Sequence, residues 1–479
     1  MPTPTYRCGG ADPIRRSAAI QGQGHQAPPT VAERRARGKQ ARKRTPRGAI
    51  AGWQPPADRC DALALLCEQD RSRLPELVPI RYGRMVASLF EFFRGTAAVM
   101  ACDLFGTPAS GLTVQLCGDA HLANFGVYAS PERALLFDVN DFDDTLPGPW
   151  EWDLRRLATS AVIAARTAGF GGAAQRQAAL AAVHAYRRWM ARYAGMGDLD
   201  VWYSRVRAAQ ALGVIKETAG VAAKAEANGL APVHTRDSLQ AQKKLTAKVD
   251  GQRRIVDDPP LVEHLAGDEL DAAESVRQSL DAYRRTLEDD RRALLERYSL
   301  VDSARKAVGV SSLGTRCYIV LLQGSAERDP LFLQIKEAGR SVLEPYLGPS
   351  RYRNHAHRVV AGQRLMQAAS DIFLGWMRDT DGRDFYWRQL SDMKGSVVVA
   401  GLKRPTALEA YVAVCAWALA RAHACSGDRF AIAAYLGGSD RLDRAVADFA
   451  STYADQVERD YERLLAAVAG GEVQADIAV

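Results

Sequence analysis

Residues 118–125 read GDAHLANF and residues 137–144 read FDVNDFDD. In the first stretch an Asp and an Asn lie five positions apart, and in the second a group of carboxylates ends an apolar run, beginning seventeen residues after Asn124 at Asp141. Chemistry on phosphates requires such groups: a carboxylate that accepts a proton, and oxygen ligands for a hard divalent cation. Carboxylates this close together repel one another unless a cation or a basic side chain lies among them. The two stretches therefore predict a functional site.

The spacing Asp-x-x-x-x-Asn, then a short hairpin, then Asp-Phe-x-Asp resembles the catalytic and metal-binding loops of kinase-fold small-molecule phosphotransferases, the aminoglycoside and choline kinases. These enzymes also carry a Tyr-Asp-Leu-Ala helix, which Trp152-Asp153-Leu154 and the residues up to Ala158 resemble. Their His-Gly-Asp opening is Cys-Gly-Asp here, with Cys117 in place of the histidine. Over most of its length the chain also resembles the bacterial domain-of-unknown-function 2252 family.

The resemblance implies roles for the polar residues. Asp119 is expected to accept the proton of a substrate hydroxyl as that hydroxyl attacks a terminal phosphate. Asn124 and Asp141 are expected to hold Mg2+, with Asp143 or Asp144 as a further ligand.

Three neighbouring residues have more than one interpretation. His121 either braces its loop by hydrogen bonding, which we favour, or acts as a ligand. Asp138 is either a third acidic ligand or a residue that ends a strand. Asp153 opens a helix and is expected to brace the Asp119 loop through backbone amides.

A second region, residues 308–390, predicts a small β-rich unit. A turn between Gly309 and Gly314 runs into a strand over 317–322, and the next strand, 331–336, ends on Lys336. A helix over 354–369 and a hairpin around Asp381-Gly382 follow. Backbone amides of a Gly-rich turn bind phosphates, and a lysine on the adjoining strand meets their charge. The residues expected to contact the nucleotide are Gly309, Ser311, Ser312, Gly314, Lys336 and Glu344, the last as the partner of Lys336.

This order of elements resembles the small lobe of a kinase, which in ordinary kinases precedes the catalytic loop and here follows it. The expected fold is therefore α+β and two-lobed, protein-kinase-like and circularly permuted, with the large helical lobe core first and the small β-rich lobe second. The expected divisions are a basic disordered tail (1–50), a helical N-terminal segment (51–115), the large-lobe catalytic region (116–300), the small β-rich nucleotide-gripping lobe (301–400) and C-terminal helices (401–479).

The distribution of charge limits the partners that the chain is expected to have, and the cysteines indicate the compartment. Residues 1–50 hold 11 Lys and Arg against 2 Asp and Glu, whereas the whole chain has a net charge of +7. Such a tail binds nucleic acid only non-specifically, if at all. No apolar run is long enough to span a membrane. The eight cysteines are scattered, and Cys102, Cys117, Cys317 and Cys415 are expected to be buried thiols, so we expect a reduced, cytoplasmic protein.

The expected function is an ATP- and Mg2+-dependent transfer of phosphate to the hydroxyl of a small-molecule acceptor. A metal-dependent phosphoesterase is an alternative, because Gly-Asp-x-His also opens such sites and would make Asp119 and His121 metal ligands. Further ligands could then come only from Asn354 and His355. A non-catalytic kinase-fold module that binds nucleotide is the third possibility.

Overall fold

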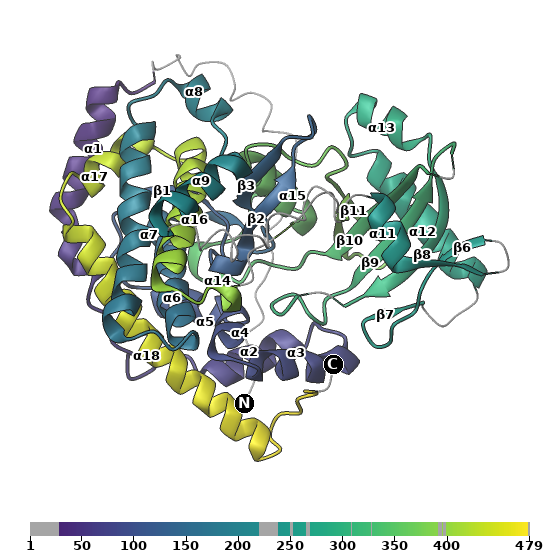
Figure 1. The fold of residues 1–479 in the computed structure, drawn as a ribbon, viewed down its shortest axis with the longest axis horizontal. Helices are drawn as coiled ribbons and strands as arrows, with labels where there is room; N and C mark the ends of the chain where they lie inside the picture. Colours follow the sequence, from purple (N-terminus) through teal and green to yellow (C-terminus); the bar gives the residue numbers. More distant parts are fainter. Residues whose placement is uncertain are drawn as a thin grey trace, which may run out of the picture.

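The computed structural model describes residues 28–219, 238–249, 252–264, 269–307, 309–326, 328–390, 395 and 399–477. Figure 1 shows a helical body, here called the large lobe (28–219 and 399–477), beside a part built on a sheet, here called the small lobe (238–337 and 372–390). The structure is a mixed α and β fold with small antiparallel sheets, consistent with the α+β class.

The large lobe consists mainly of helices. They are α1 (Val31–Arg44), α2 (Ala62–Asp70), α3 (Val78–Val86), α4 (Leu89–Arg94), α5 (Ala97–Leu104), α6 (Trp150–Thr167), α7 (Gly172–Tyr193), α8 (Asp198–Tyr203), α9 (Ala208–Ala219), α16 (Pro405–Ser426), α17 (Arg429–Leu436) and α18 (Arg441–Ala469). Nearly every residue of α6 and most residues of α16 are buried. Both helices are rich in alanine, whose small side chain lets neighbouring helices approach closely. The charged residues of α6 therefore need partners inside the protein.

Two short antiparallel ladders carry the two sequence stretches of interest. β1 (Thr113–Leu116) pairs with β4 (Leu146–Pro149), and β2 (Phe125–Ala129) pairs with β3 (Leu135–Val139). The Asp119 loop connects β1 to β2, and the carboxylates follow β3. The strand–loop–hairpin–carboxylate order expected from the sequence is confirmed.

The small lobe is built on an antiparallel sheet with the strand order β11-β12-β10-β9-β8-β7. Its elements are α11 (Ser238–Leu245), β5 (Thr246–Val249), β6 (Gln252–Ile255), β7 (Val262–Glu263), α12 (Glu269–Arg284), α13 (Asp289–Leu295), β8 (Ser299–Lys306), β9 (Cys317–Gln323), β10 (Pro330–Glu337), β11 (Gly375–Arg378) and β12 (Asp384–Gln389). β7 pairs with β8, α11 packs on β10, and α12 packs on β11 and β8. Elements that precede residue 301, the expected start of the small lobe, therefore pair with or pack on this sheet.

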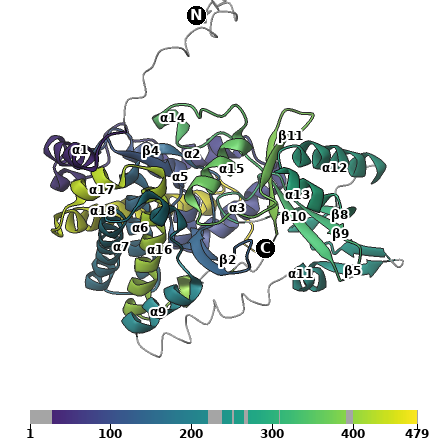
Figure 2. The ribbon, with the colours of Figure 1, turned by 90° about the horizontal axis from the view of Figure 1, so that it is seen from above.

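Helices α14 (Glu344–Leu347) and α15 (His355–Met366) follow β10 in the chain. α15 packs on α16 of the large lobe and on β11 and β12 of the small lobe. It is drawn at the centre of the molecule in Figure 1, and Figure 2 shows it again between the two lobes. The hairpin expected around Gly382 is confirmed as β11 and β12, with Gly382 at a φ of +81°.

Residues 28–50 belong to the large lobe, which corrects the disordered tail expected over 1–50. Helix α1 packs on α17, and a Cβ at Gly38 would lie 2.0 Å from a backbone oxygen of α17. Ile50 is fully buried. The prediction was wrong because α1 packs through close backbone approach at a glycine and not through large apolar side chains, so its composition gives little signal. Residues 1–27 lie outside the described residues.

The structure pairs Cys60 with Cys102 in a disulfide, which corrects the expectation that Cys102 is a thiol and that the chain is fully reduced. This disulfide joins the segment before α2 to α5, and no Cys-x-x-Cys spacing in the sequence predicts it. Cys117, Cys317 and Cys415 are buried and free, as expected. Among the helices that the structure describes, none is long and apolar enough to cross a membrane.

Candidate functional site

The loop after β1 turns at Gly118, and this turn places Asp119. Gly118 has a φ of +89°, and a Cβ there would lie 2.5 Å from the carbonyl oxygen of Asp144, so the position requires glycine. In the first turn of α6, Asp153 accepts the backbone N–H groups of Cys117 and Gly118 at 2.8 and 3.2 Å. The expected bracing role of Asp153 is confirmed.

The Asp119 carboxylate is buried and paired with a cation that the sequence analysis missed. Arg156 of α6 donates from Nε to Asp119 Oδ1 and from Nη2 to the carbonyl oxygen of Phe93 at 2.9 Å. Burial raises the pKa of Asp119 to about 7; Arg156 opposes this rise, and Asp144 and Asp141 add to it. A carboxylate with a pKa near neutrality is suited to accept a proton at physiological pH.

His121 and Asn124 flank Asp119 in different ways. His121 is buried, and its Nε2 lies 3.5 Å from Asp119 Oδ2 while its Nδ1 has no hydrogen-bond partner in the part of the chain described. The favoured interpretation of its side chain as a brace is therefore not supported. Asn124 donates from Nδ2 to the carbonyl oxygen of Asp119 at 2.8 Å, and its own carbonyl accepts the N–H of Asn140 at 2.9 Å. Asn124 thus joins the Asp119 loop to the carboxylates after β3.

These carboxylates differ in what surrounds them. Asp138 accepts two backbone N–H groups at 2.9 Å, which favours its interpretation as a strand-end residue. Asp144 accepts one backbone N–H at 3.0 Å. Asp141 accepts the N–H of Asp143 at 3.2 Å. Burial and the charge of Asp143 raise the pKa of Asp141, which would fall if a cation bound there.

Lys336 extends from the small-lobe sheet to these carboxylates. It is 3% exposed, and its Nζ donates to Asp143 Oδ2, while the hydroxyl of Tyr386 on the adjacent strand donates to Asp143 Oδ1 at 2.8 Å. Burial lowers the pKa of Lys336, but the charges of Asp141 and Asp143 outweigh burial and raise it well above its ordinary value. Both oxygens of Asp143 are thus engaged by protein donors, which makes Asp141 the better placed carboxylate for a cation.

Glu344, expected to pair with Lys336, pairs with Arg340 instead, at 3.1 Å. The turn that precedes α14 brings the carboxylate of Glu344 close to Arg340, which lies four residues earlier in the chain. On α15, Arg358 donates to the carbonyl oxygen of Asp143 at 2.7 Å and to two neighbouring carbonyls. Helix α15 therefore holds the backbone of the loop that follows β3 (residues 140–145, here called the acidic loop). Asp143 of this loop is the partner of Lys336.

The turn between Gly309 and Gly314 lies close to Lys336 in the sheet, because Cys317 at the start of β9 is the register partner of Lys336. The two glycines have φ values of +76° and +90°. Two arginines before and within α3 hold the turn: Arg73 donates to the carbonyls of Ser311, at 2.8 Å, and Leu313, and Arg84 donates to that of Gly309 at 2.7 Å. The turn is thereby fastened to the large lobe.

Direct contacts link the residues expected at the site across 217 residues of sequence. Asp119 contacts Asn124, Asn124 contacts the residue before Asp141, and Lys336 contacts Asp143. The Asn124 side-chain oxygen and the Asp141 carboxylate are oxygen donors of the kind Mg2+ prefers, and Mg2+ commonly keeps waters and binds substrate phosphates besides. Within the described ranges no group of three His, Cys, Asp or Glu residues could hold a metal ion.

Asn354 and His355, the expected source of further ligands for a phosphoesterase, have another role. Asn354 Nδ2 and the His355 backbone N–H each donate to the carboxylate of Asp384 at 2.7 Å. They connect the start of α15 to β12.

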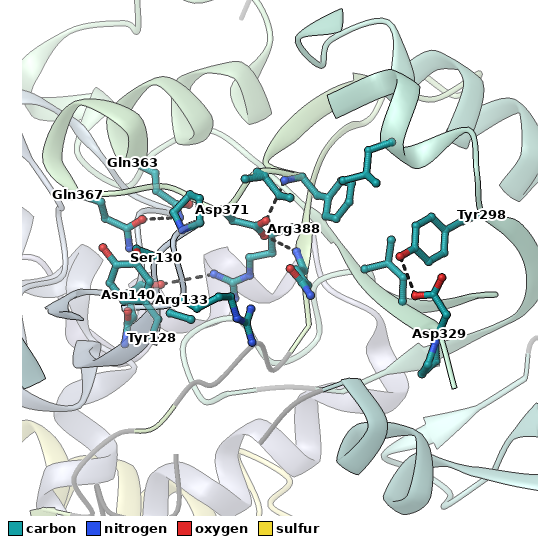
Figure 3. A pocket seen from close by; sticks show the side chains of 18 of the residues that line it. Tyr128, Ser130, Arg133, Asn140, Tyr298, Asp329, Gln363, Gln367, Asp371 and Arg388 are labelled. Atoms are coloured by element: carbon teal, nitrogen blue, oxygen red, sulfur yellow. Dashed lines mark hydrogen bonds between the residues drawn. The ribbon is translucent and has the colours of Figure 1, made fainter. Parts of the chain in front are cut away.

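A cavity of about 380 Å3 lies next to the acidic loop (Figure 3). Residues of the β2–β3 hairpin and of the end of α15 line one side of it in Figure 3, and Tyr298 and Asp329, which directly precede β8 and β10, lie on the other. Arg388, one of the lining residues, donates to the carbonyl of Asn140 at 3.4 Å and to Gln334 at 2.9 Å. Asn140 also lines the cavity and directly precedes Asp141 in the chain. The size is typical of a small-molecule site.

Arg156, Tyr386 and Arg388 are the residues of the site that sequence reasoning missed. Arg156 carried a usable signal, because a charged residue in an Ala-rich helix that is expected to be buried needs a partner inside the protein. Tyr386 and Arg388 alternate with core residues on β12 and carry no such signal.

The chain matches the model of a family described as an uncharacterized protein conserved in bacteria (DUF2252) over residues 73–467. The match covers most of the chain and includes the Asp119 loop, the acidic loop and Lys336, so the chain belongs to the DUF2252 family. No curated protein and no solved structure matches the chain.

Proposed function

We propose that this DUF2252 family member is an ATP- and Mg2+-dependent phosphotransferase with a circularly permuted kinase-like fold, acting on the hydroxyl of a small molecule. The fold part of the proposal is supported by the small-lobe sheet. Its strands follow the order expected of a kinase small lobe: a Gly-containing turn between β8 and β9, a lysine on β10, then helix α15, then the β11–β12 hairpin. The residues of the catalytic loop come earlier in the chain, as a permutation requires.

The observation that carries the functional proposal is the contact between Lys336 and Asp143 beside Asp141. A buried lysine from one lobe reaches the carboxylates of the other although 193 residues separate the pair. Lysine has three donors, and one contact with Asp143 leaves others for a phosphate oxygen. Asn124 and Asp141 would hold Mg2+, whose contribution is to neutralise the charge of the phosphates.

Asp119 would act on the acceptor. Its carboxylate takes the proton of the acceptor hydroxyl while the hydroxyl oxygen forms a bond to the terminal phosphorus and ADP leaves with the electron pair of the broken P–O bond. Arg156 holds the carboxylate in place and keeps part of its population ionised near pH 7.

Two near-isosteric substitutions test the assignment. Asp119→Asn should leave the affinity for Mg2+–ATP close to that of the wild type, while turnover falls by roughly a hundred- to ten-thousand-fold, the usual loss when a general base is removed. Asp141→Asn removes a charged metal ligand and should weaken Mg2+-dependent nucleotide binding itself. Affinity is measured by calorimetry, and turnover by ATP hydrolysis until an acceptor is found.

Asp448→Asn is the matched control, because Asp448 lies on the exposed side of α18, where it pairs with Arg176, away from the site. If both site variants hydrolyse ATP as fast as the wild type, the measured hydrolysis does not come from this site. The non-catalytic nucleotide-binding module then replaces the phosphotransferase as the proposed function. Stabilisation by Mg2+ or Mn2+ that is indifferent to nucleotide would favour the phosphoesterase.

A further inference from the structure

We propose that the cavity of about 380 Å3 is a second small-molecule site, and that its ligand is a polyhydroxylated anion, a polyol that carries a phosphate or a carboxylate. The volume lies within the range of about 300–1,000 Å3 that is typical of small-molecule sites. The proposal goes beyond the phosphotransferase function and does not rest on it, because the described residues that line the cavity include neither Asp119 nor Lys336.

The cavity lies toward the end of the small-lobe sheet that is remote from Lys336. Leu331 lines it, and Lys336 follows on β10 five residues later, about 17 Å along an extended strand. Leu331 and Phe373 belong to the core cluster of Trp387 on β12. The preceding residue, Tyr386, is the register partner of Lys336 and points to the opposite face of the sheet, because side chains alternate along a strand. The cavity is therefore set apart from the expected place of the phosphates.

Arg388 supplies a positive charge in the middle of the cavity (Figure 3). Within the described part of the chain its hydrogen bonds go to neutral oxygens, those of the Gln334 side chain at 2.9 Å and of the Asn140 backbone at 3.4 Å. A guanidinium remains charged in a protein and has five N–H donors, so these two bonds leave donors for a ligand. Bonds from such a group to an anion are stronger than bonds to neutral oxygens.

The acidic residues that line the cavity are engaged by protein donors. The carboxylate of Asp371 accepts the backbone N–H groups of Phe373, at 2.8 Å, and of Gln389. Asp329 accepts the hydroxyl of Tyr298 at 3.0 Å, on the side of the cavity away from Arg388 in Figure 3. The described lining thus has two acidic residues against three arginines, which are Arg133, Arg328 and Arg388. This excess of positive charge favours an anionic ligand.

Arg133 supplies an independent observation. It ends the turn between β2 and β3 with a φ of +64°, in the left-handed region where a long side chain is uncommon and glycine is favoured. Its side chain lines the cavity. The strained position therefore holds a second guanidinium in the cavity wall, where a glycine would relieve the backbone but remove the charge.

The rest of the lining suits hydroxyl groups. Gln363 donates from Nε2 to Gln367 at 2.8 Å, and Asn140 and Gln389 also line the cavity. Amide side chains both donate and accept hydrogen bonds, as hydroxyl groups do. The ring of Phe373 adds an apolar surface for a carbon chain. A polyol with one anionic group would therefore use both the amides and the arginines.

Calorimetry on the full chain tests the site with three matched probes, which are sorbitol 6-phosphate, gluconate and sorbitol. The wild type should bind at least one of the two anions, about tenfold or more tightly than neutral sorbitol, and the tighter anion identifies phosphate or carboxylate as the bound group. Arg388→Gln and Arg133→Gly should each weaken that binding by about tenfold or more, the effect of losing a charge-assisted bond. Binding should persist when Mg2+ and β,γ-imido-ATP, which is not hydrolysed, are present.

Arg188→Gln is the control, since Arg188 is an exposed arginine of α7 and the substitution makes the same change of charge. The site is overturned if neither anion binds at millimolar concentration, if sorbitol binds equally well, if Arg388→Gln keeps the wild-type affinity, or if Arg188→Gln loses as much. Displacement of the anion by Mg2+ and β,γ-imido-ATP assigns Arg388 to the nucleotide and overturns a second site. If Arg388→Gln does not fold, Arg133→Gly decides, and wild-type affinity in that variant overturns the anion site. None of these outcomes bears on the phosphotransferase, whose ATP hydrolysis is measured without a polyol.

Discussion

Replacing Arg156 by methionine tests whether Asp119 acts as the base. The substitution keeps an apolar stem in α6 but removes the guanidinium from Asp119 Oδ1. Two unit charges about 4 Å apart interact by about 4 kcal/mol at an effective dielectric constant of about 20, and about 1.4 kcal/mol corresponds to a tenfold change in the ionisation equilibrium. The pKa of Asp119, about 7 in the wild type, should therefore rise in the variant.

Asp119 accepts a proton only when it is ionised, so kcat/KM should decline as the pH falls through about 7 in the wild type. In Arg156→Met this acidic limb should move upward by about one to three pH units, the range that a neighbouring opposite charge typically produces. Turnover at pH 7 should then fall by roughly 5- to 500-fold and recover as the pH rises toward the shifted pKa. The assay is ATP hydrolysis from pH 5 to 9.5.

Arg155→Met is the matched control, because Arg155 is the adjacent buried arginine of α6 and donates to Thr107 and Ile50, away from Asp119. It can lower stability, but its acidic limb should coincide with that of the wild type. An unshifted limb in Arg156→Met, with turnover reduced equally at every pH, would refute the reasoning and leave Arg156 as a packing residue.

The same ionisation affects folding stability. An unfolded Asp ionises near pH ~3.9, whereas Asp119 keeps its proton up to about pH 7 in the folded chain. The raised pKa thus contributes stability that is fully present below the unfolded value and is lost as the pH rises through about 7.

Three further predictions concern packing and pairing. Gly38→Ala should lower the melting temperature by several degrees, because its Cβ would lie 2.0 Å from a backbone oxygen of α17; an unchanged value would show that α1 does not pack there. Lys336→Met should destabilise the chain by about 1.5–3 kcal/mol in urea unfolding, because it removes the charged donor of Asp143, whose side chain is 28% exposed, and Asp143→Asn in the same background should restore part of the loss. Thiol labelling without reductant should leave Cys60 and Cys102 unmodified, and Cys60→Ser should lower the melting temperature; labelling of both in the untreated protein would contradict the pairing.

Local patterns in the sequence were sufficient for the elements of the site. The Gly118–Asn124 loop lies between β1 and β2 as its flanking apolar runs predict, and Lys336 ends the apolar run of β10. Asp153 braces the loop because its position at the start of a helix places its carboxylate near backbone amides, and a helical pattern shows that position.

The partners of these residues were decided by the tertiary structure alone. Arg156 pairs with Asp119 across 37 residues and Lys336 with Asp143 across 193, and in both cases the sequence offered other charges of the right sign, Glu344 among them. Which of these charges forms the ion pair depends on how α6, β10 and α14 pack. A charge that is buried without a partner costs several kcal/mol, so the pair forms between the groups that the packing brings together. The sequence by itself determined which chemical groups this protein has and on which elements they stand, since strand alternation and helical period act over a few residues. Only the packing of the two lobes decided which of those groups meet, since contacts between residues hundreds of positions apart leave no local pattern.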